Sequence, residues 1–316
     1  MIKILNTKSK NFERQLEYCL NLRRKYSEPT VRIVKKIVQD IRKNKDKSLI
    51  KYEKKFNGLK KLNKNQLFFT KTEIKNSINN LDPKVKRSID LAFSRIKNFH
   101  KKQKFQGFKT KDKYNNVFSY RSKPMNKIGV YVPGGKASYP SSVLMNCIPA
   151  IIAGVKEIFM TVPALKNKVN PGILYAAKKC KVKKIFKLGG AQAIAAFAFG
   201  TETVNKVDKV VGPGNEYVAL AKKEVLGETG IDMFAGPSEV TIIADKYSNP
   251  EWISADLIAQ SEHDEMSQSI LVTDSKDITK NVQNFLKMQL KFLPKKKIAS
   301  SSLGNFGISI LAKSSK

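Results

Sequence analysis

Gln260 and His263 are the two side chains of this sequence whose types and spacing best fit a metal site. Apolar residues recur at helical spacing after Pro250, and positions three apart on a helix share a face, so the two side chains point the same way. Asp256 falls on that face as well. Imidazole nitrogen suits zinc, whereas an amide oxygen is an unusual ligand. On spacing alone a solvated polar face is the better interpretation, because short motif matches are common by chance.

Four glycine-containing turns form a second group of candidate binding residues. In an open parallel sheet, ligands bind at the carboxyl ends of strands, where such turns offer free backbone N–H groups. No G-x-G-x-x-G fingerprint is present, so the Rossmann signature does not by itself indicate a dinucleotide. Close packing explains any one of these turns, but four of them together indicate a ligand site. They span residues 132–135, 188–192, 211–215 and 235–238.

The elements that must position these turns alternate between strand and helix after Tyr120. Such βαβ periodicity implies a mostly parallel sheet covered on both faces, and so an α/β fold. The residues before 105 predict helices at 12–26, 29–56, 71–81 and 83–104. Strands are predicted at 128–132, 157–162, 184–188, 207–211, 239–244, 269–273 and 307–311, with helices at 141–155, 171–180, 191–199, 216–226 and 278–292 as well as the segment carrying Gln260 and His263.

Composition limits the classes of protein to which the chain belongs. Its 316 residues suffice for two domains, and 41% hydrophobic residues exclude a wholly disordered chain. The net charge of +34 comes from dispersed lysines, and no arginine follows Arg121, which argues against a nucleic-acid partner. Three separated cysteines indicate a reducing compartment, and neither a signal peptide nor a membrane span is predicted. We therefore expect a soluble, cytoplasmic protein without a nucleic-acid or membrane partner.

Five motifs, in their order and spacing, resemble the histidinol dehydrogenase family. They are GVYVPGG (129–135), GGAQAIA (189–195), VVGPGNEYV (210–218), GIDMFAGPSE (230–239) and AQSEHD (259–264). The resemblance is specific from about residue 128 to 273 and looser towards both ends. It implies a pair of incomplete Rossmann-like domains and the oxidation of L-histidinol to L-histidine through histidinal, with zinc and two NAD molecules used in turn.

The resemblance also implies roles for single residues and a division into domains. Gln260 and His263 would be zinc ligands that also touch the substrate, Ser238 would bind the substrate, and Tyr131, Gln192 and Asn215 would bind NAD. The expected domains are a helical N-terminal tail (1–26), a first Rossmann-like domain (27–130 with 238–316) and a second one that contacts NAD (131–237). The family forms homodimers.

The chain departs from the family at its end. The family's base pair, an adjacent Glu and His in a Pro-Glu-His-Leu context, and its remaining zinc ligands, an Asp and a His, fall beyond Lys316. We therefore expect a C-terminally truncated member, to which we assign no catalytic base, with Asp256 as an alternative third zinc ligand. Two other hypotheses stay open, namely a binder of NAD or a small molecule without metal chemistry, and a lysine-rich protein that associates with nucleic acid or anionic surfaces.

Overall fold

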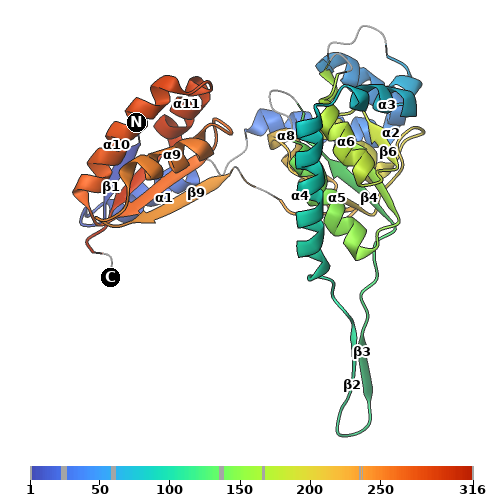
Figure 1. The fold of residues 1–316 in the computed structure, drawn as a ribbon, viewed down its shortest axis with the longest axis horizontal. Coiled ribbons are helices and arrows are strands. Elements are labelled where there is room, and N and C mark those ends of the chain that lie inside the picture. Colours follow the sequence, from blue (N-terminus) through green and yellow to red (C-terminus); the bar gives the residue numbers. More distant parts are fainter. Residues whose placement is uncertain are drawn as a thin grey trace. The chain divides into compact units, whose positions relative to one another are not determined.

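The computed structural model describes residues 2–22, 27–57, 62–134, 139–165, 168–234, 236 and 238–314. The chain folds into two compact units (Figure 1). The small unit comprises residues 1–27 and 236–316, and the large unit comprises residues 28–235. Each unit has its own parallel sheet and its own buried core. The predicted α/β class is confirmed.

The sheet of the large unit contains five parallel strands in the order β6-β5-β4-β7-β8. The chain runs outward from β4 to β6, then crosses back to the other side of β4 for β7 and β8. The direction of winding therefore reverses between β4 and β7, which is where doubly wound sheets bind ligands. The strands are β4 (Lys127–Tyr131), β5 (Glu157–Thr161), β6 (Lys184–Phe186), β7 (Lys209–Val211) and β8 (Gly230–Ile231).

Helices cover both faces of this sheet. One contacting group, in front of the sheet in Figure 1, consists of α3 (Lys71–Asn79), α4 (Pro83–Lys101), α5 (Pro140–Ala153) and α6 (Pro171–Lys179). The other consists of α2 (Glu28–Asn57), α7 (Gly190–Phe199) and α8 (Glu216–Glu224). Strands covered on both faces lose the apolar–polar alternation, and β4 and β5 are accordingly almost continuously buried.

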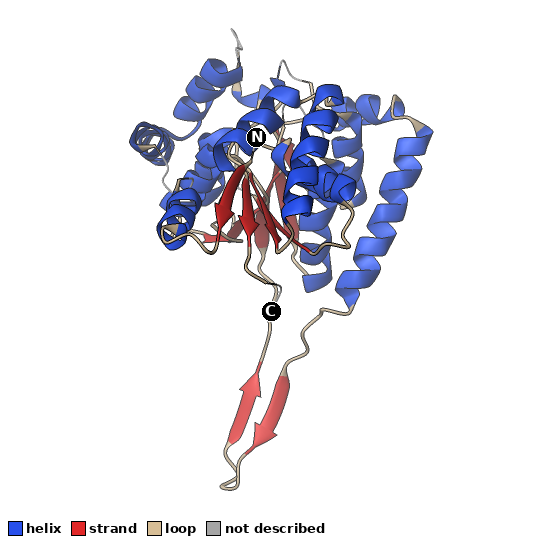
Figure 2. Ribbon diagram, turned by 90° about the vertical axis from the view of Figure 1, so that its left-hand side faces the viewer, coloured by secondary structure: helices blue, strands red, loops and turns tan. Residues whose placement is uncertain are grey.

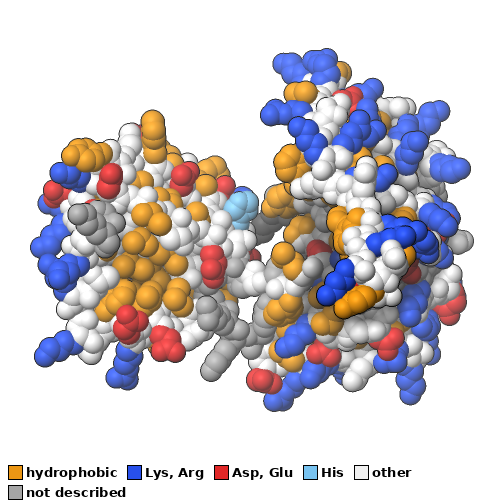
Figure 3. All heavy atoms as spheres, turned by 90° about the horizontal axis from the view of Figure 1, so that it is seen from below, with side chains coloured by type: hydrophobic (Ala, Val, Ile, Leu, Met, Phe, Trp, Pro, Cys, Tyr) orange, Lys and Arg blue, Asp and Glu red, His pale blue; other side chains and the backbone are white. Residues whose placement is uncertain are grey.

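The small unit has a parallel sheet in the order β1-β11-β10-β9, with three helices packed on one side. Leu257, Leu271 and Val282 lie in the core between sheet and helices. The opposite face is less covered, since Ile243 is 83% exposed, and Figure 3 shows hydrophobic side chains gathered on this unit. The elements are β1 (Lys3–Asn6), α1 (Phe12–Asn21), β9 (Glu239–Ala244), α9 (Pro250–Ser261), β10 (Gln268–Thr273), α10 (Lys276–Phe292), α11 (Lys296–Phe306) and β11 (Ile308–Leu311).

An antiparallel hairpin of the large unit was not predicted. Its strands are β2 (Phe108–Lys111) and β3 (Val117–Tyr120), and all their residues are exposed. Figure 2 shows the hairpin extending away from the rest of the chain's helices and strands. No helix within the described ranges is long and apolar enough to cross a membrane.

The expected division into domains differs from the contacts of the structure. Residues 28–130 pack with 131–235 rather than with 238–316, because α2 lies against α7 and α8, and α4 lies against α5 and α6. The N-terminal segment is no separate helical tail, since β1 pairs with β11 and α1 ends at Asn21. These contacts join residues far apart in sequence, and local periodicity carries no information about them.

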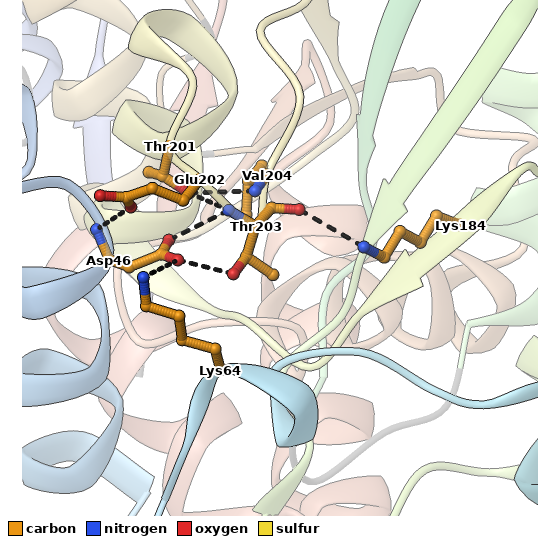
Figure 4. A network of polar contacts seen from close by, with 7 residues as sticks. All are labelled: Asp46, Lys64, Lys184, Thr201, Glu202, Thr203 and Val204. Atoms are coloured by element: carbon orange, nitrogen blue, oxygen red, sulfur yellow. Dashed lines mark hydrogen bonds and ion pairs between the residues drawn. The ribbon is translucent and has the colours of Figure 1, made fainter.

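A polar network joins α2 to the loop after α7 (Figure 4). Lys45 interrupts α2 with a φ of 48°, and its ammonium donates to the carbonyls of Phe199 and Gly200 at the end of α7 (3.1 Å each). The next residue, Asp46, is buried, accepts from the Thr203 hydroxyl (2.6 Å) and lies 3.7 Å from the ammonium of Lys64, the first residue of the 3-10 helix η1 (Lys64–Gln66). The break in α2 is thus stabilised by contacts with α7 and the following loop.

Replacing Asp46 tests this network. Asp46→Ala removes a buried acceptor and leaves the Thr203 hydroxyl unsatisfied, so we expect a loss of about 2 to 3 kcal/mol in the free energy of unfolding. Urea denaturation followed by circular dichroism measures it. Lys64→Met is the matched control, because it removes only the exposed partner of the ion pair and should cost less than about 1 kcal/mol. Equal losses in the two variants would contradict this interpretation.

Candidate functional site

A first group of candidate residues lies in the large unit, where winding reverses between β4 and β7. Gly212, directly after β7, has a φ of +113°, and a Cβ there would lie 2.1 Å from the carbonyl oxygen of Tyr131 at the end of β4. Only glycine adopts this backbone without strain and also allows so close an approach. The turn of residues 212–215 is therefore packed directly against the end of β4.

Lys222 and Asp232 hold this turn on both sides. Lys222, with 5% of its side chain exposed, lies 2.7 Å from Asp232 and also donates to the carbonyl of Gly212. Asp232 in turn accepts from the N–H of Gly212 (2.8 Å). A pocket of about 240 Å³ opens beside them, lined by Asn146, Gly212, Pro213, Gly214, Val218, Ala219, Lys222, Asp232 and Met233. A rigid turn beside a pocket is suited to binding part of a ligand.

Asn215 lies at the N-terminus of α8. Its side-chain oxygen accepts from the N–H of Val218 (3.2 Å) and so caps the helix, as asparagine commonly does. Asn215 is exposed, and the first turn of a helix carries unpaired N–H groups and the positive end of the helix dipole. This end of α8 is suited to a ligand that carries anionic or acceptor groups.

Tyr131 and Gln192 come together at the turn before α7. The Tyr131 hydroxyl accepts from the N–H of Gly190 (3.1 Å), and the Gln192 amide donates to Glu53 (2.8 Å). The N–H of Gly189 also donates to Glu53 (3.2 Å). Both predicted residues are almost fully buried. Asn215, the third predicted dinucleotide contact, lies at the separate turn after β7.

Sequence reasoning missed Glu53, a carboxylate only 1% exposed. Burial raises the pKa of the Glu53 carboxyl to about 7, although hydrogen bonds from Gln192, Gly189 and Asn57 oppose this shift. Burial also raises the pKa of Tyr131 to about 12, which keeps its hydroxyl neutral. A signal for Glu53 was present, because it follows the buried Leu49 by four residues and so shares the core-facing side of α2.

A second group of candidate residues lies in the small unit, at the end of α9. The helix stops at Ser261, so His263 lies in the turn beyond it, where its N–H donates to the carbonyl of Gln260 (3.3 Å). The prediction that one helix carries both residues is wrong for His263. Gln260 is half-buried and His263 is exposed, as is Asp256 earlier on the helix. The negative end of the α9 dipole makes this turn favourable for a cation.

Ser238 lies at the same edge of the small sheet. It directly precedes β9, and its carbonyl accepts from the N–H of Gln268, the first residue of β10 (3.0 Å). Gln260 also reaches this edge, through a long contact with the Ser267 hydroxyl (3.5 Å). These residues lie at the amino ends of β9 and β10. The turn of residues 235–238 was expected at the carboxyl ends of strands, where parallel sheets usually bind ligands. Ala235 and Pro237 of that turn are outside the described residues.

The donors of this turn can be compared with what zinc requires. Gln260 and His263 supply two, whereas a catalytic zinc ion normally has three protein ligands. Across the described ranges, no cluster of three or more His, Cys, Asp or Glu side chains is placed to hold a metal ion. The described residues therefore do not form a complete site for a catalytic zinc ion. Asp256, the alternative third zinc ligand, does not belong to such a cluster among the described residues.

Comparisons with known proteins agree with this arrangement. The histidinol dehydrogenase family model matches residues 21–316. The chain is 51% identical to the histidinol dehydrogenase of Pelagibacter ubique and 41% identical to that of Neisseria meningitidis serogroup A, covering 98% and 99% of itself and 72% and 73% of those proteins. It superposes on a crystal structure of histidinol dehydrogenase from Elizabethkingia anophelis with a TM-score of 0.89 at 36% identity, covering 99% of itself and 71% of that chain. The chain thus belongs to the histidinol dehydrogenase family.

Proposed function

We propose that the chain takes part in the zinc- and NAD-dependent oxidation of L-histidinol to L-histidine through histidinal. The observation that carries the proposal is the turn at Gly212, which packs against the end of β4 at the β4–β7 switch point, where a parallel sheet binds its ligand. Family membership supplies the reaction. A cytoplasmic homodimer belongs to the same proposal.

The residues of the large unit bind the dinucleotide in this proposal. The packed turn at Gly212, the pocket beside it and the exposed N-terminus of α8 at Asn215 offer backbone donors and space for one part of NAD. The turn held by Tyr131 and Gln192 offers a second set of backbone groups. NAD accepts the hydride from each of the two oxidation steps.

In this proposal the residues of the small unit bind the substrate and supply two of the ligands of the metal ion. Gln260 and His263 provide two zinc ligands, and Ser238 contacts the amino alcohol. Bound zinc would hold the alcohol oxygen and polarise it. We assign no general base among the described residues. Two donors do not complete the coordination of the metal ion.

NADH formation tests the proposed reaction. L-Histidinol, NAD and zinc are added to the chain, and to a chimera that continues it with the C-terminal residues of the Pelagibacter relative, while absorbance at 340 nm is followed. We expect two NADH per histidinol from the chimera and little or none from the chain alone, whose described residues supply only two zinc donors. A folded chimera that forms no NADH would overturn the proposal.

Removal of the imidazole tests the zinc ligands directly. His263→Asn should weaken zinc binding at least about tenfold, because imidazole is the stronger donor of the pair. Calorimetric titration of the chain with zinc measures this. His100→Asn is the matched control, because His100 is the other histidine of the chain and lies half-buried on α4 of the large unit. If both variants bind zinc as the unaltered chain does, His263 is not a ligand.

A second candidate function is a dinucleotide binder without metal chemistry. The observation in its favour is that the described part of the chain holds no group of three or more His, Cys, Asp or Glu side chains placed for a metal ion. Titration with NAD in the presence and absence of zinc separates the candidates. Zinc binding that depends on His263 supports the dehydrogenase, whereas NAD binding with no zinc binding at all supports the binder.

A further inference from the structure

The carboxylate of Glu53 is surrounded by hydrogen-bond donors. Gly189 N–H and the Gln192 amide donate to one oxygen (3.2 and 2.8 Å), and the Asn57 amide donates to the other. Within the described ranges no lysine, arginine or histidine forms an ion pair with it. A buried acid without a cationic partner is costly to ionise. None of the roles proposed above uses this group.

The charge of Glu53 determines how the Gln192 amide can lie. An ionised carboxylate only accepts, so the amide nitrogen of Gln192 faces Glu53. The amide oxygen of Gln192 then faces Gly190, because a Cβ atom built at Gly190 would lie 3.0 Å from that oxygen. A protonated Glu53 can donate, and the amide can then turn over and present its NH₂ group to the Gly190 side.

We propose that Glu53 is a positioning residue of the dinucleotide-binding turn, whose charge sets the orientation of the Gln192 amide and thereby decides whether that turn offers an acceptor or a donor. The inference deepens, and rests on, the proposed role of the turn in NAD binding. Glu53 itself lies on α2 behind the turn and acts through Gln192 and Gly189.

The surroundings of Glu53 favour a change of charge in the neutral range. Burial raises the pKa of its carboxyl to about 7. Tyr131, which faces it from β4, stays neutral because burial raises the pKa of that hydroxyl to about 12. Lys187, after β6, pairs with Glu73 (2.6 Å) instead. On α2 itself the neighbouring charges are Lys54 and Lys55, and the Lys55 ammonium lies over the Phe56 ring.

The orientation of Gln192 can be followed without any ligand. In the ¹⁵N-labelled full chain, we expect the side-chain amide signals of Gln192, identified by their loss in Gln192→Ala, to shift between pH 5.5 and 8.5 with a midpoint near the pKa of about 7. In Glu53→Gln they should stay constant. This variant keeps an oxygen for Gly189 and Gln192 but cannot ionise. Signals that are constant in the unaltered chain, or that titrate equally in both, would overturn the inference.

NAD affinity gives the functional readout. Calorimetry should show that the affinity for NAD differs about tenfold between pH 5.5 and pH 8.5, the effect of one reoriented hydrogen bond. Glu53→Gln should bind NAD with the same affinity at both pH values, within about threefold of the unaltered chain at pH 8.5. Asp40→Asn, a carboxylate-to-amide change elsewhere on α2, should keep the pH dependence.

The outcomes separate the inference from the function on which it rests. If the unaltered chain binds no NAD at any pH, the proposed dinucleotide role fails, while the amide signals of Gln192 still decide the role of Glu53. If NAD binds and Glu53→Gln keeps the full pH dependence, the inference fails and the dinucleotide role stands.

Discussion

Gly212→Ala is expected to destabilise the large unit by about 4 kcal/mol, from a strained backbone and an overpacked contact together. Gly212 has a φ of +113°, and the added Cβ would meet the Tyr131 carbonyl oxygen at 2.1 Å. That atom belongs to the backbone of the central strand β4, so it cannot move aside as a flexible side chain would. The turn after β7 must shift instead, and NAD affinity should fall by at least about a hundredfold.

Gly227→Ala separates the two causes of this effect. Gly227 also has a positive φ, of +101°, but nothing lies within 4 Å of a Cβ built there. Its replacement should therefore cost only the conformational strain, about 1 to 2 kcal/mol, and leave NAD affinity unchanged. Thermal unfolding and calorimetry with NAD measure both variants. Equal losses of stability would show that backbone strain, and not contact with β4, makes Gly212 necessary.

The sequence predicted most of the parallel strands, for a local physical reason. Strands buried on both faces are short apolar runs, as are β4 and β5, which were predicted at residues 128–132 and 157–162. β1 was missed, because its four residues are recognisable as a strand only beside β11, about three hundred positions later in the chain. The hairpin strands β2 and β3 were missed because no residue of theirs is buried, so no strand face had to be apolar.

The candidate site was predictable where a motif lies inside one turn. Gly190 and Gly212 indicate their turns by their residue type, since glycine adopts their positive φ values (+60° and +113°) without strain. The position of His263 was not predictable from spacing, because no glycine or proline marks the end of α9 at Ser261. The hydrogen bonds of Glu53 were not predictable, because its partners Gly189 and Gln192 lie more than a hundred residues away in the sequence.

Glu53→Gln is expected to become steadily more stable than the unaltered chain as the pH rises. Burial raises the pKa of Glu53 from 4.5 to about 7 in the folded protein. Below pH 4.5 the Glu53 carboxyl is neutral in both the folded and the unfolded state, so its ionisation does not change the free energy of unfolding. Between these values the unfolded chain has already released the proton, so the free energy of unfolding falls with increasing pH. The whole effect is about 3 kcal/mol and is complete above pH 7.

Glu73→Gln provides a control of opposite sign. Burial acts to raise the pKa of Glu73, but hydrogen bonds with Lys187 and Thr70 outweigh it and lower that pKa. Ionised Glu73 therefore stabilises the fold at neutral pH and loses this effect as the pH falls, so Glu73→Gln should be less stable than the unaltered chain at pH 8 and approach it in acid. Urea denaturation of the three proteins from pH 3 to 8 measures both trends, because the effect of Glu73 is lost below pH 4.5. Among the described residues, Glu53 is buried without a cationic partner, whereas Glu73 is exposed and pairs with Lys187, so parallel trends in the two variants would refute this difference.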